Sequence, residues 1–420
     1  MSAHQTDAAF AAVLIIAGSF GDLFGRKRVF LAGIAGFGVA SLVAGLAQNP
    51  AELIAARVVQ GAAAAAMIPQ LLATFRTIFT HAERGKAFGM YGAILGFASA
   101  LGLVLGGVLT SANLFGWSWR SVFFINVPVA ILAFTAAARL VPETRDRSAG
   151  RPDVTGAVLL ACALVAVAYP LLEGRSLGWP AWAWLLLVAG LVMLAGLGLV
   201  EERRQHTRVA PLLRTRLFRI PAFTAGLFVM LAFSAGIQGF FLVLAVWLQT
   251  GMGYSPLAAG LTALAFSAGS FLLASAAVPL ARRYGRYVLC GGGLLLAAGI
   301  GAVQLGAGHV GTGSDPWPVV PGLALAGAGL SLLVIPLANV VLAAVPSHAA
   351  GGAGGLFSTA QQLGGALGVA VVGTIFFGQL GGHSFTQAFT HSLPVTAGLF
   401  LAAAVLSLLL PKTAVADEHG

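Results

Sequence analysis

Charged residues are scarce in this chain, and acidic residues are the scarcest of them. Only 9% of the 420 residues are charged, and only 13 are Asp or Glu. Soluble globular proteins carry about 25% charged residues, so this composition excludes that class. The chain has two cysteines, Cys162 and Cys290, in separate apolar segments. They exclude a disulfide framework and a cysteine-based metal site.

Signals of nucleotide chemistry are also missing. The sequence holds no P-loop, so ATP is not the expected energy source. The run 306–311 matches G-x-G-x-x-G, but it follows an apolar helix and lacks the strand–turn–helix setting of a dinucleotide site. The eight histidines show no metal-ligand spacing. We therefore expect no cofactor, no metal ion and no enzymatic activity.

Long apolar runs fill the chain instead. Hydrophobic residues make up 58% of it, and the mean hydropathy is +0.92. A membrane span needs about 20 apolar residues. The pattern predicts an all-α polytopic membrane protein with about 13 spans. They lie near 6–20, 29–47, 52–75, 86–110, 121–141, 153–172, 181–200, 221–249, 257–280, 286–305, 317–345, 352–378 and 394–411.

The net charge is +10, and the basic residues that produce it cluster in short loops between these runs. This distribution is typical of a membrane protein and is not that of a nucleic-acid-binding surface. With the loop at Arg26 placed in the cytoplasm and the sides alternating, 20 of the 23 bases fall inside. The seven tryptophans fall on or near the outer interface. We expect a multi-pass protein of the plasma (inner) membrane, with the C-terminus in the cytoplasm and the N-terminus outside.

The stretch GSFGDLFGRKRVFL, residues 18–31, is a short charged turn between two apolar segments. Glycine permits a tight turn, and the bases favour the cytoplasmic side. The spacing Gly-x-x-x-Asp-x-x-Gly-Arg-Lys resembles the loop signature of the major facilitator superfamily of secondary transporters. An ordinary positively charged loop is the alternative. The motif residues are Gly18, Asp22, Gly25, Arg26, Lys27 and Arg28.

Further stretches extend the resemblance to the fourteen-span drug/proton antiporters of that superfamily. Residues 57–61 (RVVQG) resemble its intramembrane arginine motif, and residues 102–107 (GLVLGG) resemble its antiporter motif, with Leu103 in place of a proline. Residues 119–128, 248–261 and 358–365 are similar to other segments of these exporters. The order of the motifs along the chain makes the resemblance specific.

The resemblance implies two pseudo-symmetric six-span halves with a two-helix insert between them. The stretch 281–286 echoes 21–26, as such halves require, and by this count the first span is absent from the sequence. The expected divisions are the N-terminal half at 1–141, the insert and basic linker at 142–219, the C-terminal half at 220–411, and a cytoplasmic tail at 412–420.

Arg57 is the one base expected deep within a span, where an ionisable side chain is costly and is functional by default. The resemblance implies that Arg57 and Gln60 take part in proton coupling by shifting the pKa of a nearby carboxylate. A structural arginine bonded to backbone carbonyls is the alternative. Gly102, Gly106 and Gly107 of the antiporter motif are either gating residues or small residues that permit close helix packing.

Polar and aromatic side chains within the spans are candidates for a large, mainly apolar substrate cavity. Each of the polar ones could equally form a helix–helix hydrogen bond. They are Asn126, Gln238, Phe240, Gln249, Asn339, Gln361 and Gln362.

The expected function is export of amphipathic small molecules or drugs by proton antiport through alternating access. The expected partners are the lipid bilayer, the substrate and protons, without nucleic acid, and the expected state is a monomer. The alternatives are an exporter or facilitator of a single endogenous metabolite, and a truncated membrane protein that does not transport.

Overall fold

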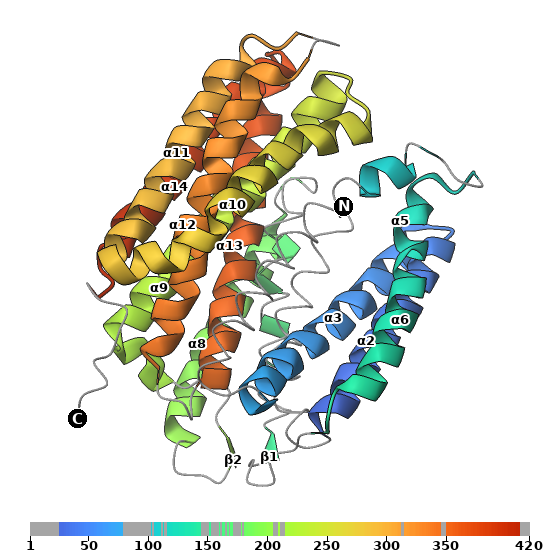
Figure 1. Ribbon diagram of the computed structural model, residues 1–420, viewed down its shortest axis with the longest axis vertical. Coiled ribbons are helices and arrows are strands. Elements are labelled where there is room, and N and C mark those ends of the chain that lie inside the picture. Colours follow the sequence, from blue (N-terminus) through green and yellow to red (C-terminus); the bar gives the residue numbers. More distant parts are fainter. Residues whose placement is uncertain are drawn as a thin grey trace. The chain divides into compact units, whose positions relative to one another are not determined.

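The computed structural model describes residues 25–78, 105–110, 116–143, 151–152, 180–204, 209–210, 215–311, 315–345 and 350–411, together with isolated residues between these ranges. Gly18 and Asp22 lie outside the described residues. The chain divides into two units (Figure 1). Unit 1 comprises Met1–Gly89, Asn113–Thr215 and His348–Gln362, and unit 2 comprises Met90–Ala112, Arg216–Ser347 and Leu363–Gly420.

Unit 1 is built around α2 (Arg26–Leu46), which packs on α3 (Pro50–Ile78) and α6 (Asn126–Leu140). The 3₁₀ turn η2 (Ser118–Arg120) and α5 (Ser121–Phe124) lead into α6, and α8 (Ala181–Arg204) follows later in the chain. The expected span 121–141 is thus interrupted at Ile125. Pro128, which cannot donate a backbone hydrogen bond to residue 124, follows shortly after this point. Ser121–Leu140 still forms one apolar segment long enough to cross a membrane, as expected.

A small parallel pairing, not foreseen from the sequence, joins the two ends of the expected insert. β1 (Arg151–Pro152) pairs with β2 (Val209–Ala210), with Arg151 opposite Val209. The pairing brings together segments that α8 separates in sequence. The remainder of the described chain outside this pairing is helix, turn or loop.

Unit 2 consists of long helices packed in contact with one another (Figure 1). α11 packs on α12 and α14, α12 also packs on α10, and α9 packs on α14. α9 continues into a π-helical turn, η4, and η5 precedes α12. The elements are η3 (Thr215–Arg219), α9 (Pro221–Val246), η4 (Trp247–Gly251), α10 (Pro256–Tyr284), α11 (Arg286–Ala307), η5 (Trp317–Val319), α12 (Val320–Ala343) and α14 (Phe385–Ser407). α13 (Ala350–Gln379) begins in unit 1 and belongs to unit 2 from Leu363 onward.

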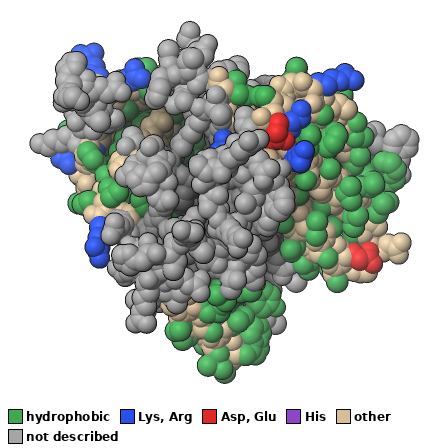
Figure 2. Space-filling model, turned by 90° about the horizontal axis from the view of Figure 1, so that it is seen from below, with side chains coloured by type: hydrophobic (Ala, Val, Ile, Leu, Met, Phe, Trp, Pro, Cys, Tyr) green, Lys and Arg blue, Asp and Glu red, His purple; other side chains and the backbone are tan. Residues whose placement is uncertain are grey.

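Within the described residues, eight helical segments are long and apolar enough to cross a membrane. Each overlaps an expected span. Their outward faces carry large apolar side chains, such as Leu132, Leu272 and Leu305 at 69%, 75% and 76% exposure. Figure 2 shows hydrophobic side chains over much of the described surface on one face. Apolar side chains exposed in this way suit contact with lipid, as expected for a polytopic membrane protein.

The last span begins earlier than the sequence pattern predicted. It starts at Phe385 and not near residue 394. Ser384 forms a capping box with Gln387: the Ser384 hydroxyl accepts from the Gln387 backbone, and the Gln387 side chain accepts from the Ser384 backbone. This cap sets the helix start. The helix then runs through Pro394, which the sequence pattern placed at its beginning.

Close backbone contact holds α10 against α12. A Cβ atom added at Gly269 would overlap the carbonyl oxygen of Ala324, and one added at Gly327 would overlap that of Phe266. At the same crossing, the hydroxyls of Ser270 and Ser331 are 2.7 Å apart. Small residues and hydroxyl hydrogen bonds are the usual means of helix association in lipid.

Candidate functional site

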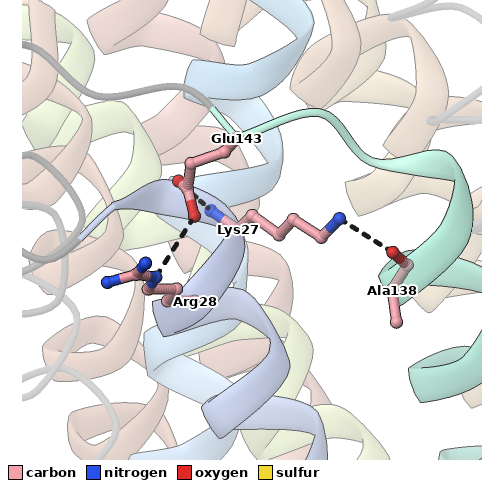
Figure 3. Close-up of polar contacts among 4 residues, drawn as sticks. All are labelled: Lys27, Arg28, Ala138 and Glu143. Carbon is pink, nitrogen blue, oxygen red and sulfur yellow. Dashed lines mark hydrogen bonds and ion pairs between the residues drawn. The ribbon is translucent and has the colours of Figure 1, made fainter.

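The charged loop ahead of α2 docks on the chain that follows α6 (Figure 3). The Lys27 backbone N–H donates to Glu143 Oε1 at 3.3 Å, and Arg28 Nε lies 3.8 Å from Glu143 Oε2. In the opposite direction, Lys27 Nζ donates to the carbonyl of Ala138 at 2.7 Å. Gly25 begins this arrangement with a φ of 99°, and a Cβ there would lie 2.6 Å from Glu143 Oε1. We call these contacts the Glu143 clamp.

The clamp complements two helix ends at once. The first turn of α2 has no acidic residue of its own, and the Glu143 carboxylate supplies the negative charge that a helix N-terminus favours. Ala138 lies in the last turn of α6, where unpaired carbonyls favour a cation such as Lys27. The Arg28 and Glu143 side chains are 80% and 41% exposed, so their ion pair contributes about 1 kcal/mol or less.

Of the predicted loop motif, Gly25, Lys27 and Arg28 take part in the clamp, and Arg26 is the first residue of α2. Glu143 was not among the predicted site residues. Its signal was an acid directly after the end of a span, in a chain with only 13 acids. The expected boundary at residue 141 assigned it to the linker.

Unit 2 repeats this arrangement with different chemistry. Gly285, with a φ of 59°, ends α10, and Arg286 begins α11. Arg286 Nη1 donates to the carbonyls of Leu408 and Leu410 at 2.7 and 3.1 Å, at the end of α14. In both units a Gly–Arg or Gly–Arg–Lys loop therefore fastens the start of one helix to the end of another.

A second polar group lies inside unit 1, between α2, α3 and α5. Arg57 Nη1 donates to Gln60 Oε1 at 2.7 Å, and Gln60 Nε2 donates to Ser41 Oγ at 2.5 Å. Ser41 and Gln60 are 0% and 2% exposed. The Arg57 guanidinium lies 5.7 Å from the centre of the Phe123 ring, within cation–π range. The structure thus brings the predicted pair Arg57 and Gln60 together and adds Ser41 and Phe123.

The three antiporter-motif glycines have different surroundings. A Cβ at Gly102 or Gly106 would meet no described atom within 4 Å. A Cβ at Gly107 would lie 2.8 Å from Leu257 Cα and 3.1 Å from the Pro256 carbonyl oxygen, in the first turn of α10. Close backbone contact with the described chain is therefore a property of Gly107 alone among the three.

The cavity candidates divide by exposure. Phe240 is fully buried and packs edge-on against Phe241, 5.6 Å between ring centres. Gln238, Gln249 and Asn339 are exposed on α9, η4 and α12. On α13, Gln361 is exposed and Gln362 is half-buried, and on α6 Asn126 is half-buried.

The chain is similar in sequence to several actinobacterial export and resistance proteins. It is 40% identical over 379 residues to the probable actinorhodin transporter of Streptomyces coelicolor, covering 90% of this chain and 65% of that protein. It is 36% identical to the puromycin resistance protein pur8 of Streptomyces alboniger, covering 98% and 84%. It is 30% identical to the multidrug efflux pump LfrA of Mycolicibacterium smegmatis, covering 93% and 73%.

Solved structures support the same fold. A peptide transporter POT in complex with sulfate superposes with a TM-score of 0.68 at 14% identity, over 96% of this chain and 84% of the other. A structure of proton-dependent oligopeptide transporters gives a TM-score of 0.66 at 17% identity, over 97% and 88%. Residues 8–369 match the family described as Major Facilitator Superfamily. The chain is therefore a member of the major facilitator superfamily.

Proposed function

We propose that this protein is a secondary transporter that exports amphipathic small molecules or drugs by proton antiport through alternating access. The observation that carries the proposal is the buried polar group at Arg57, with its hydrogen bond to Gln60 inside a largely apolar unit. The export and resistance functions in the names of the relatives support the same direction of transport.

Arg57 suits proton coupling through its permanent charge. Arginine stays protonated in proteins, so it acts on a titrating partner and does not carry the proton itself. Holding that charge in a low-dielectric span is costly, and the Gln60 and Phe123 contacts offset part of the cost. A charge retained at such a cost supports a functional role for Arg57 and Gln60.

Gating is assigned to the charged loop and the antiporter motif. The loop residues are Gly18, Asp22, Gly25, Arg26, Lys27 and Arg28. The Glu143 clamp supports this role because its exposed ion pair is weak enough to open during a transport cycle. For the antiporter motif, the support is the contact of Gly107 with the first turn of α10. We extend the gating role to Gly102 and Gly106 of the same motif, where an added Cβ would meet no described atom within 4 Å.

The substrate cavity is assigned to exposed polar side chains on apolar helices. A glutamine facing lipid would leave its amide unsatisfied, which costs free energy. The exposure of Gln238 and Gln249 therefore supports contact with water or substrate. The same reasoning applies to Asn339 and Gln361. Phe240 is buried, so its role would be to pack behind the residues that line the cavity.

A second candidate is a dedicated exporter of one natural product. The observation that favours it is that several relatives have names that refer to one compound each, among them actinorhodin and puromycin. A panel of structurally unrelated compounds distinguishes the two candidates. A drug exporter protects cells against several members, including ethidium and puromycin, and a dedicated exporter protects against one.

The main test is ethidium accumulation in cells that express this chain. We expect lower accumulation than in empty cells, and we expect a protonophore or Arg57→Ala to abolish the difference. Arg283→Ala is the matched control, because it removes the same charge from an exposed position beside Tyr284. Export that persists in the presence of the protonophore would refute proton antiport. No protection against any compound in the panel would refute export.

A further inference from the structure

The hydroxyl of Ser41 ends a buried chain of hydrogen bonds that begins at Arg57. We propose that Ser41 is a positioning residue for proton coupling: it orients the Gln60 amide, which in turn holds the Arg57 guanidinium in place. The inference rests on the proposed function of Arg57. Ser41 lies on α2, whereas the predicted coupling residues Arg57 and Gln60 lie on α3.

The donor and acceptor properties of the three side chains allow only one arrangement. Arginine has donors and no acceptor, so Gln60 must present its carbonyl oxygen to Arg57. The Gln60 NH₂ group then points away from Arg57 and needs an acceptor of its own. Ser41 Oγ supplies that acceptor at 2.5 Å, from the neighbouring helix. The orientation of the amide is therefore determined by Ser41 at one end and Arg57 at the other.

Phe123 also contacts the guanidinium. Gln60 accepts a hydrogen bond from Nη1 at its edge, and the Phe123 ring centre lies 5.7 Å from its central carbon. Arg57 and Gln60 lie on α3, and Phe123 lies on α5. A shift of the Gln60 amide would remove its hydrogen bond to the guanidinium and change the position that the charge favours.

Removal of the Ser41 hydroxyl should change the position of the Arg57 guanidinium through Gln60. In Ser41→Ala the Gln60 NH₂ group is buried without its acceptor, which leaves the desolvation cost of that group uncompensated. Rotation of the amide toward another acceptor relieves that cost but withdraws the carbonyl oxygen from Arg57. A role limited to helix packing predicts a different result, because a looser contact between α2 and α3 would impair every step of transport.

The experiment compares two rates in cells or proteoliposomes: ethidium export driven by a proton gradient, and downhill ethidium efflux without one. We expect Ser41→Ala to lower the driven rate about tenfold and the downhill rate less than about twofold, since 1.4 kcal/mol is a factor of ten. Ser234→Ala is the matched control. Ser234 is 1% exposed, and within the described chain its hydroxyl has no hydrogen-bond partner.

A double substitution tests whether Ser41 acts through Gln60. In a Gln60→Ala background, Ser41→Ala should change the driven rate no further, because the amide that it positions is gone. Equal losses of both rates in Ser41→Ala, additive losses in the double variant, or no loss at all would each overturn the inference. A wild-type protein with no gradient-driven export would instead overturn the proposed function, and this inference with it.

Discussion

Substitution of Gly25 by alanine should open the Glu143 clamp. Gly25 has a φ of 99°, a region that costs other residues about 1–3 kcal/mol. The new Cβ would also lie 2.6 Å from Glu143 Oε1 and displace the carboxylate from the N-terminus of α2 (Figure 3). Loss of that interaction costs about 0.3–1 kcal/mol more. The sum is about 1.3–4 kcal/mol, or an opening equilibrium shifted about 10- to 700-fold.

Amide hydrogen exchange reports this opening directly. The Lys27 N–H is bonded to Glu143, and the Val29 N–H is bonded to the Gly25 carbonyl at 3.1 Å. Exchange in the peptide 25–31 should therefore accelerate by at least about 10-fold in Gly25→Ala. In Glu143→Gln, which keeps the glycine and removes only the charge, the acceleration should be about fivefold or less.

Gly116→Ala is the control for backbone strain alone. Gly116 has a φ of 75°, and a Cβ there would meet no described atom within 4 Å. This variant carries a similar local strain but should leave exchange in the peptide 25–31 unchanged. Unchanged exchange in Gly25→Ala, or equal acceleration in Gly116→Ala, would refute the account of the clamp.

Two further predictions use pairs of glycines with contrasting surroundings. Gly107→Ala should lower the ethidium export rate about tenfold or more, because its Cβ would meet the backbone of Leu257. Gly301→Ala on α11, with no described atom within 4 Å of its Cβ, should change the rate less than about twofold, and equal rates in the two variants would contradict this. Gly269→Ala should lower the melting temperature in detergent by several degrees, because it forces α10 from Ala324. Gly291→Ala in α11 should raise the melting temperature slightly, because its Cβ meets open space and alanine favours the helix.

Most of the helices could be predicted from hydropathy because each span is a local property of about 20 residues. The error occurred where a local chemical detail overrides hydropathy. The capping box at Ser384 starts α14 about nine residues before the apolar run. Its residues are present in the sequence, but they are a weaker signal than the apolar pattern around them.

The site was predictable only where its members share a motif. Arg57 and Gln60 lie three positions apart on α3, so their contact follows from helical spacing. Ser41 lies 19 positions from Gln60 on another helix, and only the packing of α2 on α3 brings them together. Nothing in the sequence of α2 or α3 indicates that the Ser41 hydroxyl has a polar partner. From sequence alone, Ser41 looks the same as Ser234, a small buried serine without a described hydrogen bond.

The echo between 21–26 and 281–286 shows both the reach and the limit of the sequence pattern. It located two loops that prove to fasten equivalent helix starts, at Gly25 and Gly285. It could not reveal how they are fastened, because the partners lie 116 and 122 positions away. Unit 1 uses a carboxylate, whose attraction for bases is screened by salt, together with the carbonyl of Ala138. The described contacts of Arg286 in unit 2 are with backbone carbonyls, which any sequence would supply. A single substitution can therefore remove the Glu143 carboxylate, whereas a substitution does not remove the backbone carbonyls that accept from Arg286. The two loops are similar in backbone but depend on side-chain identity to different extents.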